Sequence, residues 1–227
     1  MKNNKKTGIE REENKITKET KRALLKGAIL RILKEGKDTV ILIDGSNINS
    51  AMRRIGERLD YKKLKKYFSP KAGRTEAIYY DWKPDFPFLK MFSENSEESQ
   101  EELKENQEKI MRAAKKESFF QALRYSGISV RNLSSKEEEE KKTDVDLIIA
   151  NDIDDYASEP GVSKIVLCSG DADFAPFLFR AKKKFGKKVV VVSGKEELSE
   201  KLREIADEVY FLEDIIEDIK LENTTFK

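Results

Sequence analysis

Aspartates that closely follow apolar segments are the residues of this 227-residue chain best suited to do chemistry. Segment 39–43 runs directly into Asp44, and segment 164–168 is followed closely by Asp171 and Asp173. Continuous runs of aliphatic and β-branched residues of this length are typical of strands buried on both faces of a parallel sheet. Because ligands bind outside the carboxyl ends of such strands, the spacing predicts one acidic crevice.

A third acidic pair, Asp144 and Asp146, opens a segment with helical spacing just before the second of these strands. Clustered carboxylates repel one another and raise one another's pKa unless a cation joins them. A set of oxygen ligands selects hard ions such as Mg²⁺ or Mn²⁺. Such ions can activate water and stabilise the leaving oxygen of a phosphodiester.

The composition removes several competing kinds of site. The chain contains no histidine and one cysteine, Cys168. Ser-His-Asp and Cys-His catalysis, imidazole zinc sites and internal disulfides are therefore excluded. A single cysteine inside an apolar segment fits a reducing cytoplasm. No apolar run is long enough to span a bilayer and no signal-peptide pattern opens the chain, so we expect a cytoplasmic protein without a membrane partner.

Each acidic cluster also has a structural interpretation. Asp171 could cap a helix with Asp173 in the first turn, and Thr143 with Asp146 resembles a capping box. Asp44 could stabilise a turn. Taken singly, each of these roles competes evenly with metal binding. Taken together they do not explain why aspartates follow two buried strands.

Alternation of short apolar segments with amphipathic ones predicts an α/β fold with a mainly parallel sheet. The expected strands cover 39–43, 76–82, 127–131, 164–168, 189–192 and 208–212. The expected helices cover 21–34, 47–68 with a break near 59–60, 109–125, 143–156, 172–184 and 196–206.

The remaining segments are predicted to flank or interrupt one domain. Residues 1–20 form a disordered basic tail, residues 21–37 hold an amphipathic helix, and residues 215–227 form a C-terminal tail. Twelve Lys and Arg face five Glu over 1–37, a balance that favours phosphate backbones or an acidic partner. The helix over 21–34 can dock on its own core or on a second copy of the chain. About 93–108 lies an acidic insertion, a solvated loop or helix face.

Three motifs resemble the NYN domain, specifically its LabA-like branch, within the PIN-like nuclease superfamily. They are Ile-Asp-Gly-Ser-Asn at 43–47, Lys-x-x-Asp-Val-x-Leu at 141–147 and Ser-Gly-Asp-Ala-Asp-Phe at 169–174. The resemblance spans 38–214. It implies a Rossmann-like three-layer α/β/α sandwich and a metal-dependent endoribonuclease that acts on single-stranded RNA.

The resemblance also assigns roles to individual residues. The implied catalytic and metal-binding residues are Asp44, Asp144, Asp171 and Asp173, holding one or two Mg²⁺ or Mn²⁺ ions. The implied substrate-binding residues are Ser46, Asn47, Arg53, Lys141 and Lys142, and Arg54 is a further candidate for backbone contact. Many relatives carry another aspartate where this chain has Ala150. That position lies six residues after Asp144. Asp146 and Asp152 are also six residues apart, so Asp146 is an alternative ligand to Asp144.

Two other functions remain open on the sequence. The domain could be a non-catalytic module that binds RNA or protein, or a nuclease of the same superfamily directed at DNA or flap structures. The four retained aspartates favour the enzyme. Discrimination between RNA and DNA depends on recognition of the 2′-hydroxyl, which these motifs do not encode.

Overall fold

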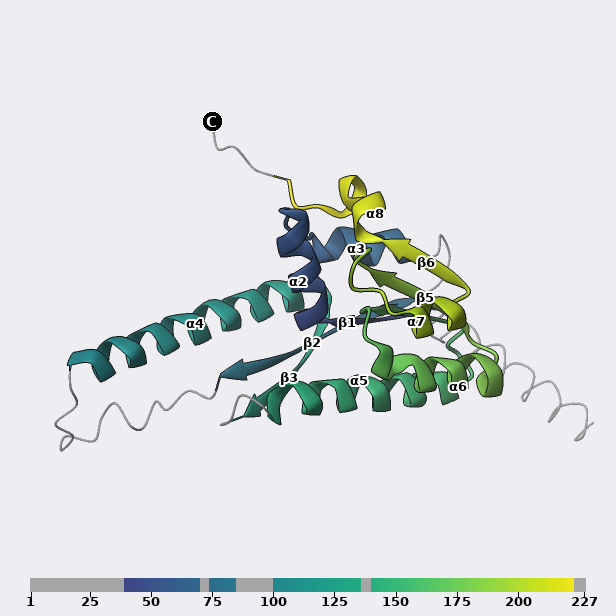
Figure 1. Cartoon of the computed structure of the whole chain (residues 1–227), viewed down its shortest axis with the longest axis horizontal. Coiled ribbons are helices and arrows are strands. Elements are labelled where there is room, and N and C mark those ends of the chain that lie inside the picture. The colour runs from purple at the N-terminus through teal and green to yellow at the C-terminus, as the bar shows by residue number, and fades with distance from the viewer. Residues whose placement is uncertain (1–38, 70–73, 85–99, 136–139, 223–227) are drawn as a thin grey trace, which may run out of the picture. The chain divides into compact units, whose positions relative to one another are not determined.

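A computed structural model describes residues 39–69, 74–84, 100–135 and 140–222 (Figure 1). The chain divides into two units, 1–36 and 37–227, and all described residues belong to the second. The predicted tail over 1–20, the helix over 21–34 and residues 93–99 of the acidic insertion lie outside the described residues. Self-association through that helix therefore stays a prediction.

The centre of the second unit is a parallel sheet of six strands in the order β3-β2-β1-β4-β5-β6. The strands are β1 (Thr39–Asp44), β2 (Thr75–Pro84), β3 (Ser129–Ser135), β4 (Lys164–Cys168), β5 (Lys188–Ser193) and β6 (Glu208–Phe211). Strand β1 lies between β2 and β4, with Asp44 opposite Tyr80 and Ile43 opposite Cys168. The carboxyl ends of the two central motif strands therefore adjoin, as the sequence predicts.

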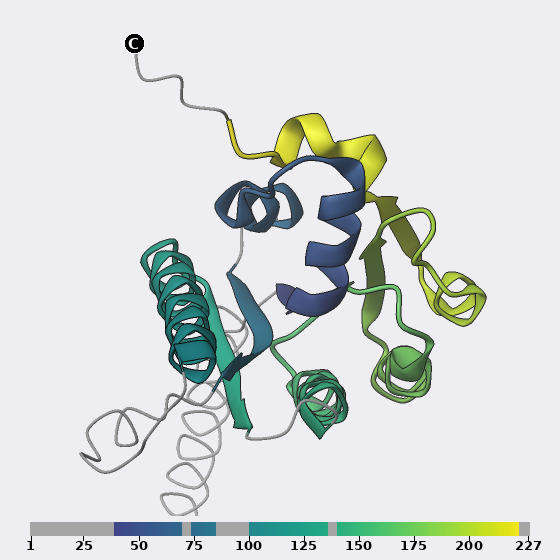
Figure 2. The ribbon, with the colours of Figure 1, turned by 60° about the vertical axis from the view of Figure 1, so that its left-hand side comes forward.

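Helices cover both faces of this sheet, which confirms the predicted α/β/α fold class (Figures 1 and 2). One core is formed with α2 (Gly45–Ile55), α3 (Tyr61–Phe68), α4 (Gln100–Tyr125) and α8 (Leu212–Ile219). The other is formed with α5 (Glu140–Ser158), the 3₁₀ turn η1 (Ala172–Phe174), α6 (Ala175–Phe185) and α7 (Glu200–Ile205). The strands alternate their apolar side chains between these two cores: Ile41 and Ile43 enter the first, Val40 and Leu42 the second.

Helices α2, α4 and α5 begin earlier than the sequence predicts, and α2 does so by only two residues, at Gly45 rather than 47. Helix α4 begins at Gln100 rather than near 109, so residues 100–108 of the acidic insertion are helical. Helix α5 begins at Glu140, which places Thr143 inside the first turn. The capping box expected at Thr143 is therefore wrong, because a cap must precede the first helical residue.

The C-terminal tail expected from residue 215 is wrong for 215–219, which belong to α8. Leu212, Ile215 and Ile219 are buried at helical spacing against the first core. This apolar face holds the segment on the domain. Across the described residues, no helix is long and apolar enough to cross a membrane.

Candidate functional site

The end of β1 and the start of α2 are organised around the carboxylate of Asp44. Its Oδ1 accepts hydrogen bonds from the amides of Ser46 at 3.0 Å and Asn47 at 3.1 Å, and from the Ser46 hydroxyl at 2.8 Å. Asp44 is thus the N-cap of α2, as its turn interpretation anticipated. Gly45 is required here, because a Cβ at this position would lie 2.3 Å from the Tyr79 hydroxyl.

The loop after β4 is joined to the same carboxylate through Ser169. The Ser169 hydroxyl donates to Asp44 Oδ2 at 3.0 Å and accepts from the Asp171 amide at 3.2 Å. Beside it, the Gly170 amide donates to Asn47 Oδ1 at 3.1 Å. The first and third sequence motifs, which are more than 120 residues apart in the chain, therefore form one hydrogen-bonded unit.

Asp171 and Asp173 lie at the solvent side of this unit. Asp171 is half-buried and its Oδ1 accepts from the Asp173 amide at 3.0 Å, so it caps η1. Asp173 is exposed in the first turn. The capping interpretation is confirmed for Asp171, but capping engages one carboxylate oxygen and does not exclude a second role for the other.

A salt-bridge cluster supports the Ser-Gly-Asp loop from the opposite side. Arg54 on α2 contacts Glu197 with Nε–Oε1 at 3.0 Å, and also Glu196 and Glu213 at 3.3 Å. The hydrogen bond to Glu197 is the main cause that raises the pKa of Arg54. A Cβ on Gly170 would lie 2.2 Å from the Glu197 carbonyl oxygen, so this cluster holds the β5–α7 loop closely against Gly170.

The two arginines proposed for phosphate contact therefore differ. The Arg54 guanidinium is bound by glutamates, whereas Arg53 is exposed and only its Nε–H⋯O contact to the Asn49 carbonyl, at 3.2 Å, is seen among the described residues. Arg53 is the better placed of the two to meet a ligand.

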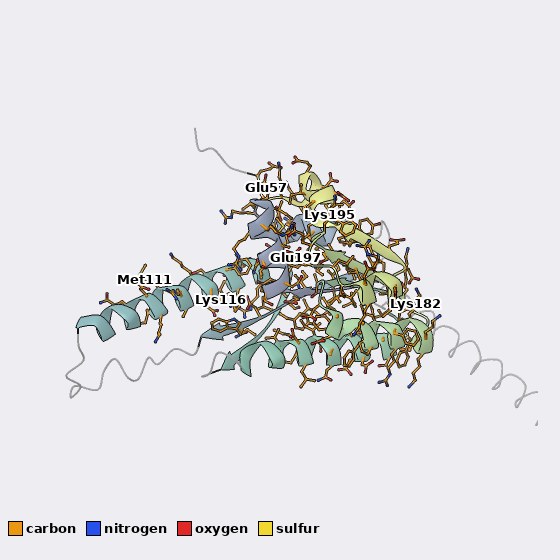
Figure 3. The ribbon with its side chains drawn as sticks, in the orientation of Figure 1. Glu57, Met111, Lys116, Lys182, Lys195 and Glu197 are labelled. Atoms are coloured by element: carbon orange, nitrogen blue, oxygen red, sulfur yellow. The ribbon has the colours of Figure 1, made fainter. Side chains whose placement is uncertain are left out.

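A buried aspartate that the sequence reasoning missed as a site feature is Asp81 in β2. It accepts from Lys116 Nζ at 2.9 Å, the Trp82 amide at 2.8 Å and the Tyr79 hydroxyl at 3.2 Å. Lys116 also lies 4.3 Å from the centre of the Trp82 ring (Figure 3). The sequence signal was present, since Asp81 follows an apolar run much as Asp44 does.

Asp152 on α5 is a second buried carboxylate with a cationic partner. It accepts from Arg131 Nη1 at 2.7 Å and from the Tyr80 hydroxyl at 2.5 Å. Burial, followed by the hydrogen bond to Asp152, raises the pKa of Tyr80 far above its ordinary value, so this tyrosine remains a neutral donor.

Asp44 differs from these two acids in its electrostatic environment. All three aspartates are at least 90% buried, with 2% exposure for Asp44, 7% for Asp81 and 4% for Asp152. Asp81 and Asp152 each contact a cation, but Asp44 has only neutral hydrogen-bond donors among the residues described. A buried carboxylate that is not paired with a cation is costly even when it is hydrogen-bonded, so Asp44 is the strongest candidate of the three for binding an external cation.

The remaining predicted site residues belong to α5, which begins on the carboxyl side of the sheet after β3. Lys141, Lys142 and Asp144 lie in its N-terminal part, but their side chains lie outside the described set. Asp146 is half-buried on the same helix. Among the side chains that are described, no three candidate metal ligands gather at one point. Asp144 and Asp146 therefore both stay open as ligands.

Comparisons with known proteins agree with the architecture. The family model of the NYN domain matches residues 38–213. A crystal structure of a protein of unknown function from Vibrio parahaemolyticus is similar with a TM-score of 0.57 and 20% identity, over 82% of this chain and 98% of that one. At this identity the likeness shows the fold alone. No curated protein matches the chain.

Proposed function

The chain belongs to the NYN domain family, within the PIN-like nuclease superfamily, and from this premise we propose that it is a metal-dependent ribonuclease. The observation that carries the proposal is the buried Asp44 carboxylate, which has no cationic partner among the described residues. A divalent cation bound at this carboxylate would compensate its charge.

The oxygen donors at this edge are of the type that a hard metal ion prefers, although the described carboxylates do not gather at one point without the ion. Asp44 is joined to Asp171 through the Ser169 hydroxyl, and Asp173 lies one turn further on. We propose that these three carboxylates, with Asp144 or Asp146 from α5, hold Mg²⁺ or Mn²⁺. When bound, such an ion lowers the pKa of water and stabilises charge on a phosphoryl oxygen.

The neighbouring side chains would orient the substrate. Asn47 uses its Oδ1 to accept from the Gly170 amide, so its amide N–H groups are left to donate to a phosphate oxygen or to water. The Ser46 hydroxyl donates to Asp44 Oδ1 and fixes the orientation of that carboxylate. Arg53 on α2, with Lys141 and Lys142 at the start of α5, would contact the phosphate backbone.

We propose that the chain belongs to the LabA-like branch, because its three motifs occur in the order that resembles that branch. The proposed substrate is single-stranded RNA cleaved internally, and the proposed location is the cytoplasm. The support for both is the resemblance together with the absence of histidine and the single cysteine.

The test is cleavage of a labelled single-stranded RNA with Mn²⁺ by the wild type and by Asp171→Asn. Asparagine keeps the oxygen that caps η1 and removes the charge. Loss of groups that merely support metal ligands costs about 10- to 100-fold, so loss of a ligand is expected to cost about 100-fold or more. Asp218→Asn, an exposed change on α8, serves as the matched control. Equal cleavage by all three proteins would contradict the site.

Two other outcomes would replace the proposal with its alternatives. Binding of RNA by the wild type without any metal-stimulated cleavage would identify a non-catalytic binding module. Faster cleavage of a matched DNA strand or flap than of RNA would identify a DNA-directed nuclease.

A further inference from the structure

A groove of about 830 Å³ lies between the η1–α6 segment and α7, and Asp173 is one of the residues that line it. Ala175, Pro176 and Phe179 from α6 form part of its apolar surface, and Lys183 and Lys201 contribute ammonium groups from its two sides. These helices lie side by side on one face of the sheet (Figure 2). The groove therefore connects directly with the candidate metal site.

The two sides of the groove are held together by Lys182. Its Nζ donates to the Ile205 carbonyl at 2.8 Å and contacts Asp207 Oδ1 at 2.7 Å (Figure 3). These contacts join the last turn of α6 to the last residue of α7 and to Asp207 beyond it. The groove is thus built into the fold before any ligand binds.

The two other lysines of the groove differ from Lys182 in their contacts. Lys183 and Lys201 are exposed and form no ion pair with the residues that the structure describes. Phe179 is 51% exposed although it is a large apolar side chain. Asp173 and Glu204 also line the groove, so its charge is mixed. The surface nevertheless combines an accessible aromatic ring with two lysines outside any described ion pair, and proteins that bind single-stranded nucleic acids use the same combination.

We propose that this groove binds the single strand next to the scissile phosphate, with a base stacked on Phe179 and phosphates contacting Lys183 and Lys201. This inference rests on the proposed ribonuclease function for the direction of the strand toward Asp173. A duplex fits the surface poorly, because its bases are stacked on one another and unavailable to an aromatic side chain.

An acidic peptide is the alternative ligand for this groove. The contact with Phe179 distinguishes it from a nucleic acid. Carboxylates could pair with Lys183 and Lys201, but they have no base to stack on Phe179. Binding that depends both on the Phe179 ring and on the two lysines would therefore identify nucleic acid rather than an acidic peptide as the ligand.

The experiment measures binding of a fluorescent single-stranded RNA in EDTA, so that no cleavage is required. Phe179→Ala is expected to weaken binding between about fivefold and 150-fold, the range for loss of one stacked base. Lys183→Ala with Lys201→Ala is expected to reduce the slope of log affinity against log salt by about 1.4. Matched controls on α4 are Tyr125→Ala, whose ring is 90% exposed, and Lys115→Ala, and both are expected to bind as the wild type does.

The outcomes separate this proposal from the proposed function. Wild-type binding that the groove variants leave unchanged would overturn the groove while cleavage with Mn²⁺ still supports the enzyme. Absence of binding by the wild type, or equal displacement of the RNA by poly-glutamate without any effect of Phe179→Ala, would also overturn it. Binding that depends on the groove in a protein that does not cleave RNA would support the groove and contradict the enzyme.

Discussion

The neighbouring strands β1 and β2 both carry a buried aspartate at their carboxyl ends, but the two carboxylates are compensated in different ways. Asp81 contacts the Lys116 ammonium, and Lys116 in turn lies over Trp82. Asp44 is more deeply buried and accepts only from amides and hydroxyls within the described residues. These neutral donors and the N-terminus of α2 stabilise the carboxylate, but no cationic side chain of the described residues pairs with it.

This difference separates a structural acid from a candidate functional one. The pair of Asp81 and Lys116 joins β2 to α4 and is complete within the protein. At Asp44 the charge is held in place by a helix cap and by Ser169, with no cation described beside it. Hydrogen bonding therefore orients the Asp44 carboxylate, and its charge remains to act on a bound cation.

The largest expected effect is that of Asp44→Asn. Metal-dependent cleavage should fall by about 100-fold or more. Stability should stay the same or rise, because asparagine caps helices as well as aspartate does and the uncompensated buried charge disappears. RNA cleavage with Mn²⁺ and urea unfolding of the same protein check both parts.

A strongly destabilising effect of Asp44→Asn would contradict the distinction drawn between Asp44 and Asp81. That result would mean that the charge itself stabilises the fold, as expected only if a cation from the chain compensates it. Asp44→Ala separates the capping contribution, because alanine removes both the charge and the cap and should cost about 1 kcal/mol of stability.

The same isosteric change at Asp81 should have the opposite outcome. Asp81→Asn leaves the Lys116 ammonium, whose side chain is 22% exposed, without its charged partner. We expect a loss of about 1–3 kcal/mol in the free energy of unfolding, with cleavage activity retained below the melting temperature. Urea unfolding measures the first and RNA cleavage the second.

Adding Lys116→Met to Asp81→Asn sharpens the result. Removing both partners leaves no unpaired charge, so the double variant should recover part of the lost stability. If the double variant were less stable than the sum of the single changes, Asp81 and Lys116 would not act as a compensated pair.

The sequence could predict that Asp44 and Asp171 lie at the same edge of the sheet, because the pattern that indicates this is local. Each follows an apolar strand within a few residues, and the carboxyl ends of adjacent parallel strands adjoin. It could not distinguish Asp81 from Asp44, since the distinguishing lysine is 35 residues away on another helix. Likewise, the cation that contacts Asp152 is 21 residues away on β3. Charge compensation of this kind is a tertiary property.

The ends of helices and strands likewise depend partly on local sequence and partly on tertiary packing. The alternation of strands and helices is encoded by periodicity and was predicted for all six strands of the sheet. Helix α8 carried a readable pattern, with Leu212, Ile215 and Ile219 at helical spacing, but the sequence prediction ended the domain at residue 214. Only the described core shows that this face is buried.

A smaller effect is expected at Arg131. Its side chain is 51% exposed, so its contact with the buried Asp152 is partly screened by water. Arg131→Met should lower stability by about 1 kcal/mol and place Asp152 in the position of Asp44, buried with neutral donors only. Urea unfolding at low and high salt tests this. An unchanged stability at both would show that the Tyr80 hydroxyl is sufficient for Asp152.

The smallest effect concerns Asp207, a compensated acid at the surface beside the groove. Its hydrogen bond to Lys182 and then that to the Val189 amide lower its pKa below the ordinary aspartate value. A lowered pKa in the folded state means that the contact stabilises the protein above the unfolded-state pKa, and that this stabilisation is lost as pH falls through the folded-state value. Asp207→Asn should therefore cost about 1 kcal/mol or less at pH 7, and the difference from the wild type should shrink in acid. Urea unfolding at about pH 7 and pH 3 measures it, with Asp218→Asn as the control. A difference that persists undiminished at the lower pH would show that the charge of Asp207 is not the source of its contribution to stability.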